Sequence, residues 1–496
     1  MVPHSVHILI ALFPAFGHSI PAISLAKRIL STPSLSEFRD VKGDAERLVT
    51  LLISKKFLPL LKEKGIIPDT ESYSEIYRGK YGRMYIELLE DGMEPVHTLL
   101  LGDHLKYFES SSKHVEAIGT FLESKKNSAI PPSCIILDMF AGMFEPFPFD
   151  HLPFYFFFSS PVVIPIQQVE PEPKTREVVD KNIIPTNRLL KKGFSLMYPR
   201  LAKSEGIIWN TSSCIEADYL SASLKTYAPN TPVYRVGPLN FPKLESNKAA
   251  RKMQNENGGH TEHHHDQLSN GNSRATPSDL DSWIAHYLDE KPTQSVLYVS
   301  FGTVVFHSSS QIMELLNGLN ATGRHVLWSL SKKQQAFLPL AEMTSPMKGV
   351  LVYNKVAVVE WATQGTVLSH PSCAAFLTHC GWNSAFESLI CGVGTIHWPV
   401  FADQPAVSGL LVKLGTGIAF DFDSESSRTD GATNLDLIPA ENITKKIEKF
   451  FGESEGGENR YAKAAKKISS KLKIAWTSEG EAYRALGKLL SIMESV

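Results

Sequence analysis

Short apolar runs alternate with stretches of helical periodicity along most of the chain. Alternation of this kind is typical of a parallel α/β sheet whose strands are connected by helices. We expect two such sheets, one in each half of the chain. The predicted strands are residues 7–13, 48–53, 134–137, 154–158 and 206–209 in the first half, and 295–301, 325–330, 350–352, 374–377 and 395–397 in the second.

One stretch, residues 244–277, breaks this alternation. It is rich in Asn, Gly, Ser, His and charged residues and almost free of large apolar ones, which predicts a disordered linker. His260, His263, His264 and His265 fall within it, but such clusters in polar tracts are normally solvated rather than metal-bound. The linker divides the chain into a first domain (1–243) and a second (278–459). The last segment, 460–496, is predicted to be mostly helix with a solvated basic face.

Length and charge narrow the class of protein. A chain of 496 residues exceeds what one core normally supports, which agrees with two domains. A net charge of −2 gives no electrostatic case for nucleic acid or an anionic membrane. No apolar run approaches the roughly 18 residues of a membrane span. Five cysteines without a CxxC pair suit a reduced compartment, so we expect a cytoplasmic protein.

The most informative segment is residues 361–404. Within it, an apolar strand leads into the polar loop HCGWNS and then into a helical pattern. Such a junction directs free backbone N–H groups and the positive end of a helix dipole at one point, which favours an anion. His379, Asn383 and Ser384 add side-chain donors for a phosphate. Trp361 offers a stacking face for a base and Asp403 with Gln404 offers partners for hydroxyls, so a nucleotide sugar is the expected ligand.

This segment resembles the donor-binding box of the plant-type family 1 glycosyltransferases, which use UDP-sugars and carry HCGWNS, a Glu and a final DQ at the same spacing. The resemblance implies the GT-B fold, an α/β architecture of two Rossmann-like doubly wound domains that face each other across a cleft. It also implies that the C-terminal helix packs back on the N-terminal domain. The resemblance implies that Trp361 stacks on uracil, with Ala362 and Gln364 nearby, and that Glu387 binds the ribose. It implies diphosphate binding by His379, Asn383 and Ser384. It also implies sugar binding by Trp382, Asp403 and Gln404, with glucose favoured over galactose.

Several of these residues have structural alternatives. Ser384 and Glu387 fit a capping box, in which Glu387 would only bond the start of the helix. Trp361 alone would be read as a core aromatic, and His379 as a satisfied core histidine. Thr363 and Gly394 stand where the family usually has proline, which predicts looser loops at both positions.

A second loop supports the donor site. The apolar strand VLYVSF enters a tight turn at Gly302 and Thr303, and the family uses this turn against the diphosphate. The chain has no GxGxxG fingerprint and no Walker motif. It also has no spacing typical of metal ligands, so we expect neither a cofactor nor a metal, with the UDP-sugar as co-substrate.

The catalytic pair is expected in the first domain. The loop FPAFGHSIP follows the first strand and opens a helix, with Pro21 in its first turn. His18 therefore lies at the carboxyl edge of the sheet, where open α/β sheets bind ligands. The family places its catalytic base in this loop, although a helix-start polar residue is the alternative. Asp138 ends a neighbouring strand and matches the family's orienting carboxylate, whereas Asp150 in a Pro-Phe loop is the weaker rival.

These observations predict an inverting O-glycosyltransferase, with UDP-glucose as the expected donor. The acceptor is expected to be a small hydrophobic hydroxylated molecule such as a phenol, flavonoid or terpenoid. Phe140, Met143, Phe144 and Ser159 lie in sequence near the catalytic pair and are core or pocket residues. Two alternatives remain: a UDP-sugar hydrolase or epimerase on the same fold, and a non-catalytic nucleotide-sugar-binding protein. We expect a monomer.

Overall fold

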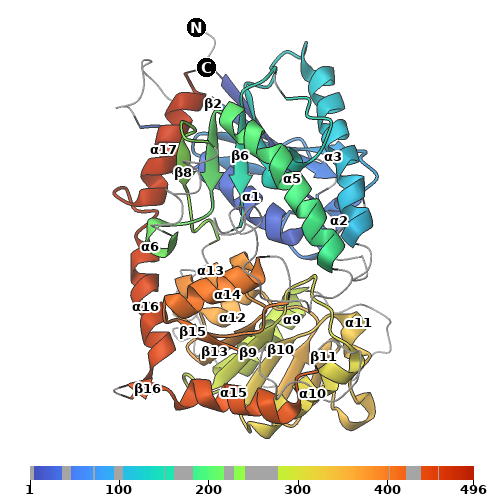
Figure 1. Cartoon of the computed structure of the whole chain (residues 1–496), viewed down its shortest axis with the longest axis vertical. Helices are drawn as coiled ribbons and strands as arrows, with labels where there is room; N and C mark the ends of the chain where they lie inside the picture. Colours follow the sequence, from blue (N-terminus) through green and yellow to red (C-terminus); the bar gives the residue numbers. More distant parts are fainter. Residues whose placement is uncertain are drawn as a thin grey trace, which may run out of the picture.

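The computed structural model describes residues 5–35, 46–70, 73–93, 104–149, 151–160, 183–216, 228–240, 277–400, 403–420, 437–455 and 457–495. Within these ranges the chain forms two lobes, each built around its own sheet (Figure 1). The predicted linker lies outside the described residues except for its last position, which already belongs to helix α9 (Pro277–Asp289). The α/β fold class is confirmed.

The N-terminal lobe contains a sheet of eight described strands in the order β3-β4-β2-β1-β5-β6-β7-β8, parallel except for the β3–β4 pair. Five of these strands were predicted, within one or two residues of their observed ends. The predicted strands are β1 (Ser5–Ala11), β2 (Glu46–Ser54), β5 (Cys134–Asp138), β6 (Phe154–Phe158) and β7 (Gly206–Trp209). The prediction missed β3 (Tyr77–Gly79), β4 (Gly82–Leu89) and β8 (Val233–Arg235). The described α-helices of this lobe are α1 (Phe16–Ile29), α2 (Leu58–Glu63), α3 (His104–Lys125), α5 (Ile183–Lys203) and α6 (Ser213–Glu216).

The C-terminal lobe contains a second sheet, ordered β11-β12-β10-β9-β13-β14-β15 and parallel except for β11–β12. Its predicted strands are all present: β9 (Val296–Ser300), β10 (His325–Ser329), β11 (Val350–Tyr353), β13 (Cys373–Thr378) and β14 (Gly394–His397). The prediction missed β12 (Val356–Val359) and β15 (Gly417–Ala419). The helices include α10 (Ser309–Ala321), α11 (Lys332–Gln335), α12 (Gln364–Leu368), α13 (Trp382–Cys391), α14 (Gln404–Lys413) and α15 (Ala440–Gly452).

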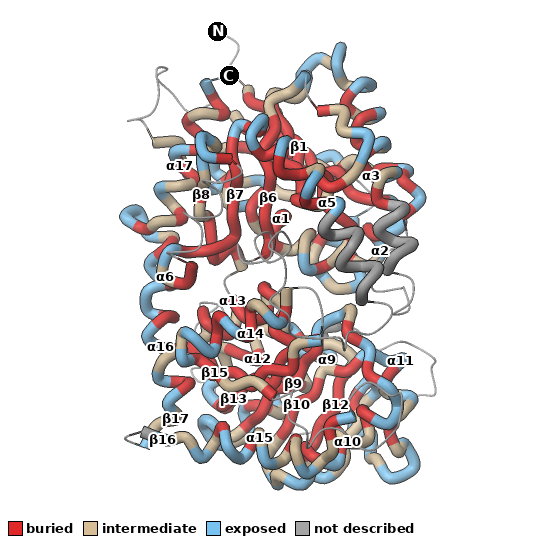
Figure 2. The backbone as a smooth tube through the Cα atoms, in the orientation of Figure 1, coloured by how far each residue is buried: buried red, intermediate tan, exposed pale blue. Residues whose placement is uncertain are grey.

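Burial explains why the central strands read as continuous apolar runs. Every residue of β5, β6, β9 and β13 is buried, because helices cover both faces of each sheet (Figure 2). In a parallel sheet of this kind the carboxyl ends of neighbouring strands meet at one edge. Ala11 at the end of β1 pairs with Leu137 of β5, one residue before Asp138. Asp138, the last residue of β5, and the segment after β1 that carries His18 therefore start side by side.

The C-terminal segment differs from the single helix that was predicted. It forms two helices, α16 (Arg460–Lys473) and α17 (Glu481–Met493), which run along one side of both lobes (Figure 1). Helix α16 packs against α13 and β14 of the C-terminal lobe, whereas α17 packs against β8 of the N-terminal lobe. The apolar side chains Leu486, Leu489 and Leu490 of α17 belong to the same core as β1 and β2.

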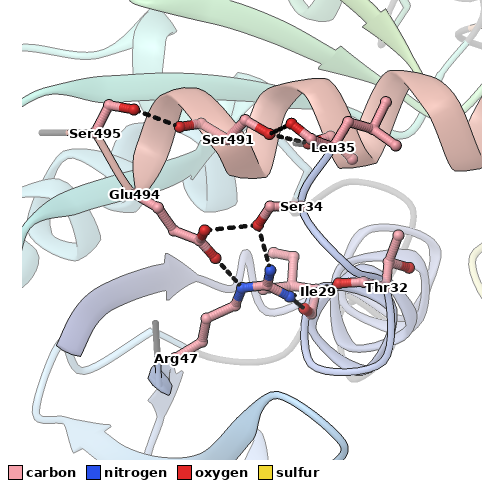
Figure 3. Close-up of polar contacts among 9 residues, drawn as sticks. Ile29, Thr32, Ser34, Leu35, Arg47, Ser491, Glu494 and Ser495 are labelled. Atoms are coloured by element: carbon pink, nitrogen blue, oxygen red, sulfur yellow. Dashed lines mark hydrogen bonds and ion pairs between the residues drawn. The ribbon is translucent and has the colours of Figure 1, made fainter. Parts of the chain in front are cut away.

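A buried ion pair anchors the end of α17 to the N-terminal lobe (Figure 3). The Arg47 guanidinium is fully buried, and its Nε donates to Oε1 of Glu494 at 2.6 Å. The remaining donors of Arg47 reach the Ile29 and Thr32 carbonyls and the Ser34 hydroxyl, which in turn donates to Oε2 of Glu494. Since every partner is supplied, the pair can be held without water, but removing one member would leave a buried charge.

None of the helices described is long and apolar enough to span a bilayer.

Candidate active site

His18 lies in the first turn of α1, because that helix begins at Phe16, earlier than the sequence predicted. Pro21 is consequently inside the helix rather than in its first turn. The chain between β1 and α1 is tightly held: the Ser19 hydroxyl donates to the Phe13 carbonyl at 2.7 Å, and the His18 N–H donates to the Ala15 carbonyl. These bonds fix the direction in which the His18 ring leaves the backbone.

His18 and Asp138 form the contact that the sequence predicted. Nδ1 of His18 lies 2.9 Å from Oδ2 of Asp138, and the side chains are 19% and 5% exposed. The other carboxylate oxygen accepts from the Phe140 N–H at 3.0 Å and caps the short 3-10 helix η4 (Met139–Met143). A carboxylate can only accept, so Nδ1 carries the proton and Nε2 keeps a free lone pair. The catalytic roles themselves stay predictions, and Asp150 lies outside the described residues.

The imidazole also has aromatic and hydroxyl neighbours. The ring centroids of Phe13 and Phe140 lie 5.5 and 4.7 Å from that of His18. The Ser159 hydroxyl lies 3.3 Å from Nδ1 of His18. Met143, by contrast, is buried in the core, so Phe140 and Ser159 are the neighbours of the catalytic pair among the residues considered as acceptor lining.

The predicted phosphate loop joins β13 to α13, and its helix has no side-chain cap at Gly381. The His379 ring lies between two glycines: a Cβ on Gly302 or Gly381 would come within 2.7 or 2.5 Å of its Nε2. Gly302 also has a φ of 72°, a left-handed conformation that favours glycine. Thr303 follows in the exposed part of this turn. These two tight approaches require glycine at both positions.

His379 is not the satisfied core histidine of the structural alternative. Its side chain is buried, and Nδ1 has no hydrogen-bond partner. Burial lowers the pKa of His379 to about 4, so the ring is neutral near pH 7. A buried polar atom without a partner is costly unless a ligand completes it. The ring also takes part in a backbone hydrogen bond with Ser300, so Nδ1 is the nitrogen left open beside the uncapped start of α13.

Three of the predicted donor residues form one hydrogen-bonded cluster. The Gln364 amide donates to the Ser384 hydroxyl at 3.1 Å and to Oε2 of Glu387 at 2.8 Å. Glu387 is reached by a side chain from another helix and lies beyond the first turn of α13, so the capping-box alternative is wrong. Burial raises the pKa of Glu387 to about 7, with the Gln364 bond acting against this rise.

Asn383 reaches across to the N-terminal lobe. Its Nδ2 donates to the Gly17 carbonyl at 2.6 Å, while its Oδ1 is buried without a partner. Trp361 makes a similar cross-lobe contact: its ring lies 5.9 Å from that of Phe16, and Nζ of Lys64 lies 5.0 Å from its centroid. Trp361 is half-buried at the end of β12 and is thus not a core aromatic, whereas Ala362 beside it is buried.

The predicted sugar-binding residues divide into two groups. Asp403 is half-buried, and burial raises its pKa to about 6, although its own N–H, the charge of His18 and the Trp382 N–H act in the opposite direction. Gln404 is buried and its Oε1 accepts from the Val400 N–H at 2.8 Å. The Trp382 indole points elsewhere: it is buried, and Nε1 donates to the Asn210 carbonyl at 2.9 Å. The indole of Trp382 is therefore not available to contact a sugar.

The two positions without the usual proline are not loose. The Thr363 hydroxyl donates to Asp281 at 3.1 Å. A Cβ on Gly394 would meet Phe450 at 2.9 Å and the Ala462 nitrogen at 3.0 Å, because α16 approaches β14 closely there. Thr363 thus has a side-chain partner, and Gly394 lies within β14 rather than in a loop. A proline ring at 394 would need α16 to move away.

Sequence reasoning missed the residues that connect the lobes. Phe16, Gly17 and Lys64 contact the predicted donor residues, and no local pattern identifies such partners. His307 was also missed. It is buried with an unpartnered Nε2, and burial lowers its pKa to about 4, with His379 contributing. Among the described residues there is no cluster of His, Cys, Asp and Glu that would hold a metal ion.

Comparisons with known proteins point to one family of enzymes. Residues 270–446 match the family model described as UDP-glucoronosyl and UDP-glucosyl transferase. UDP-glycosyltransferase 101 of Panax ginseng is 29% identical over 333 residues, a match spanning 64% of this chain and 62% of that protein, so it covers less than two thirds of the relative. UDP-glucose flavonoid 3-O-glucosyltransferase 6 of Fragaria ananassa is 26% identical over an alignment that covers 97% of each protein.

Solved structures show the same fold. UGT2 of Phytolacca americana, solved with UDP-2fluoro-glucose and pterostilbene, superposes with a TM-score of 0.66 at 21% identity over 98% of this chain and 99% of that one. Os79 of O. sativa, solved with U2F and trichothecene, gives a TM-score of 0.67 at 18% identity over 98% of this chain and all of that one. The α/β fold, the matched family model and the plant relatives agree, and together they support a plant-type UDP-glycosyltransferase.

Proposed function

We propose that this protein is an inverting O-glycosyltransferase that moves a sugar from a UDP-sugar, with UDP-glucose as the donor, to a small lipophilic alcohol or phenol. The observation that carries the proposal is the His18–Asp138 pair, 2.9 Å apart, in a helix turn that contacts Trp361 and Asn383 of the donor box. A base in one lobe is thus placed beside the donor residues of the other.

The reaction begins with the acceptor hydroxyl against Nε2 of His18. The ring accepts the hydroxyl proton while Asp138 stabilises the imidazolium that forms. The acceptor oxygen forms a bond to C1 of the sugar as the bond from C1 to the diphosphate oxygen breaks, and its electron pair leaves with UDP. Attack from the face opposite UDP converts an α-linked donor into a β-glycoside. The proton then passes from the imidazolium to solvent or to the departing diphosphate.

The charge that develops on UDP is met by fixed donors. The N-terminus of α13 and the Asn383 amide supply N–H groups that are already in place before the reaction. Because these groups can neutralise the leaving diphosphate, we infer that transfer needs no metal ion. Activity that survives EDTA supports this inference, and activity restored only by Mg²⁺ or Mn²⁺ contradicts it.

The end of the donor box and the names of two relatives support the choice of substrates. Asp403 and Gln404 stand at the end of the donor box, where the family's pattern favours glucose. The strawberry relative is named a flavonoid 3-O-glucosyltransferase, and a relative from Solanum aculeatissimum, 30% identical over 287 residues, is named a nuatigenin 3-beta-glucosyltransferase. Phe13 and Phe140 around His18 suit a flat or polycyclic acceptor of this kind.

One assay tests the proposal. Purified protein is incubated with UDP-glucose and a panel of phenols, flavonoids and terpenoid alcohols, and UDP and glycoside are measured together by mass spectrometry. The expected result is one β-glycoside for each UDP released. Release of UDP together with free glucose would indicate a hydrolase, and an isomerised UDP-sugar would indicate an epimerase. Tight UDP binding without turnover would indicate a binding protein. Each of these outcomes contradicts the proposal.

A further inference from the structure

The first turn of α1 contains a backbone carbonyl that the helix itself does not use. In an α-helix the Gly17 carbonyl would accept from the N–H of residue 21. Residue 21 is Pro21, which has no N–H and whose ring pushes the carbonyl away from the helix axis. The sequence GHSIP therefore frees one carbonyl immediately before His18.

Asn383 from the other lobe takes this carbonyl. Its Nδ2 lies 2.6 Å from the Gly17 oxygen, and since a carbonyl can only accept, the nitrogen must face it. An amide nitrogen carries two hydrogens, so one can hold Gly17 while the other donates to a phosphate. The same side chain can thus contact the diphosphate and the backbone next to His18. Its Oδ1 is buried and has no hydrogen-bond partner in the protein.

A second contact holds the same turn from the other side of Gly17. The Phe16 ring lies 5.9 Å from Trp361 and 5.3 Å from Phe57, and Phe16 is only 6% exposed. The residue before Gly17 is consequently packed on the predicted base-stacking tryptophan, and the residue after it is His18. Phe16 and Gly17 fix the turn against the base end and the phosphate end of the donor box.

We infer that Pro21, Asn383 and Phe16 position the catalytic base: the carbonyl freed by Pro21 and the ring of Phe16 attach the His18 turn to the donor site. The inference rests on the proposed function and adds three positioning residues to it. Its consequence is that loosening the attachment slows only those transfers that need His18 as a base. An acceptor that arrives already ionised does not need that base.

Pro21→Ala is the most direct test. The new N–H at position 21 bonds the Gly17 carbonyl within the helix and competes with Asn383. Transfer from saturating UDP-glucose is measured at pH 8 with substituted phenols of graded acidity. We expect the least acidic phenol to react about tenfold more slowly, as part of the base contribution is lost, and an ionised nitrophenol less than about twofold more slowly. The Kd for UDP, from calorimetry, is expected to stay within about twofold.

Two further variants make the result interpretable. Pro199→Ala is the matched control, because Pro199 also lies inside a helix of the N-terminal lobe, near the end of α5 that leads into β7. It should keep the wild-type dependence on phenol acidity. Phe16→Leu removes the aromatic contact without adding a donor and should reproduce the Pro21→Ala pattern, with thermal unfolding confirming that each variant is folded.

Two outcomes overturn the inference. Equal slowing of all phenols together with weaker UDP binding would mean that these residues only support the donor site. Wild-type rates across the whole series in both Pro21→Ala and Phe16→Leu would mean that the attachment has no role. If the wild-type protein glycosylates no phenol or alcohol at all, the proposed function itself fails, which is a different result.

Discussion

The two halves of the candidate site differ in how complete they are without a ligand. In the N-terminal lobe, Nδ1 of His18 is paired with Asp138, whose second oxygen is bonded by a main-chain N–H. In the C-terminal lobe, Nδ1 of His379 and Oδ1 of Asn383 are buried without partners. Burial also raises the pKa of Glu387 to about 7 and that of Asp403 to about 6.

The difference indicates that a bound ligand would complete the donor half of the site, in the C-terminal lobe, rather than the catalytic half. The base is organised in advance, so its contribution should appear in the rate of transfer. Buried polar atoms of the donor residues lack partners within the protein, so the contribution of these residues should appear in affinity and in the stability of the ligand-free protein. Substitutions in the two halves are therefore expected to give separable effects.

The largest effect is expected from His18→Ala. Without the base, transfer to an alcohol should fall by about 10³-fold, within the usual range for general-base catalysis, whereas the Kd for UDP should stay within about twofold. Rates come from product mass and affinity from calorimetry. Near-normal turnover of an alcohol would remove His18 from the mechanism.

Asp138→Asn should be nearly as damaging. The amide oxygen can still accept from the Phe140 N–H, but the NH₂ group then faces Nδ1 of His18 and forces the proton onto Nε2. We expect kcat to fall by about 10²-fold or more, because the ring is held in the wrong tautomer. Ser159→Ala is the matched control at the same nitrogen and should cost only a few-fold. Equal losses in the two variants would contradict the role of the carboxylate.

Glu494→Ala tests whether the N-terminal lobe can be weakened without touching the donor site. It removes the carboxylate that Arg47 contacts in the buried ion pair, and breaking such a pair typically costs about 3–5 kcal/mol. The first thermal transition should move down while the Kd for UDP at 20 °C is retained. Glu494→Gln keeps an acceptor for Arg47, so its unfolding temperature should lie between those of Glu494→Ala and the wild-type protein. A loss of UDP affinity that parallels the loss of stability would show that the halves are not separable.

Glu387→Gln should weaken UDP binding and stabilise the ligand-free fold. Losing the carboxylate that we propose as the partner of the ribose hydroxyls should weaken UDP binding by about tenfold. In the wild-type protein the folded pKa of about 7 lies above the unfolded value, so this group stabilises the fold at low pH and that stability is lost as the pH rises through 7. The ligand-free variant should therefore be more stable at pH 8 by about 1 kcal/mol, allowing for partial exposure. Calorimetry measures UDP affinity, and thermal unfolding at pH 5 and pH 8 measures stability. If the stability difference between Glu387→Gln and the wild-type protein is the same at pH 5 and pH 8, the raised pKa is contradicted.

The sequence predicted the central strands because they are buried on both faces and read as unbroken apolar runs. It missed β4, whose burial alternates along GRMYIELL, and β12, which follows β11 through a tight turn at Asn354. The donor residues were found from one contiguous segment. Their partners Phe16, Gly17 and Lys64 belong to the other lobe, and local patterns carry no information on how two lobes meet. The direction of the Trp382 indole was missed for the same reason, since its partner Asn210 lies far away in the chain.

The most direct test of the central claim is a crystal structure of the protein with UDP bound. We predict the uracil stacked on Trp361, the ribose hydroxyls on Glu387, and the diphosphate within hydrogen-bond distance of His379 and Asn383, with the His18–Asp138 pair unchanged. A nucleotide bound elsewhere, or bound here with the Nδ1 of His379 and the Trp361 ring still uncontacted, would contradict it.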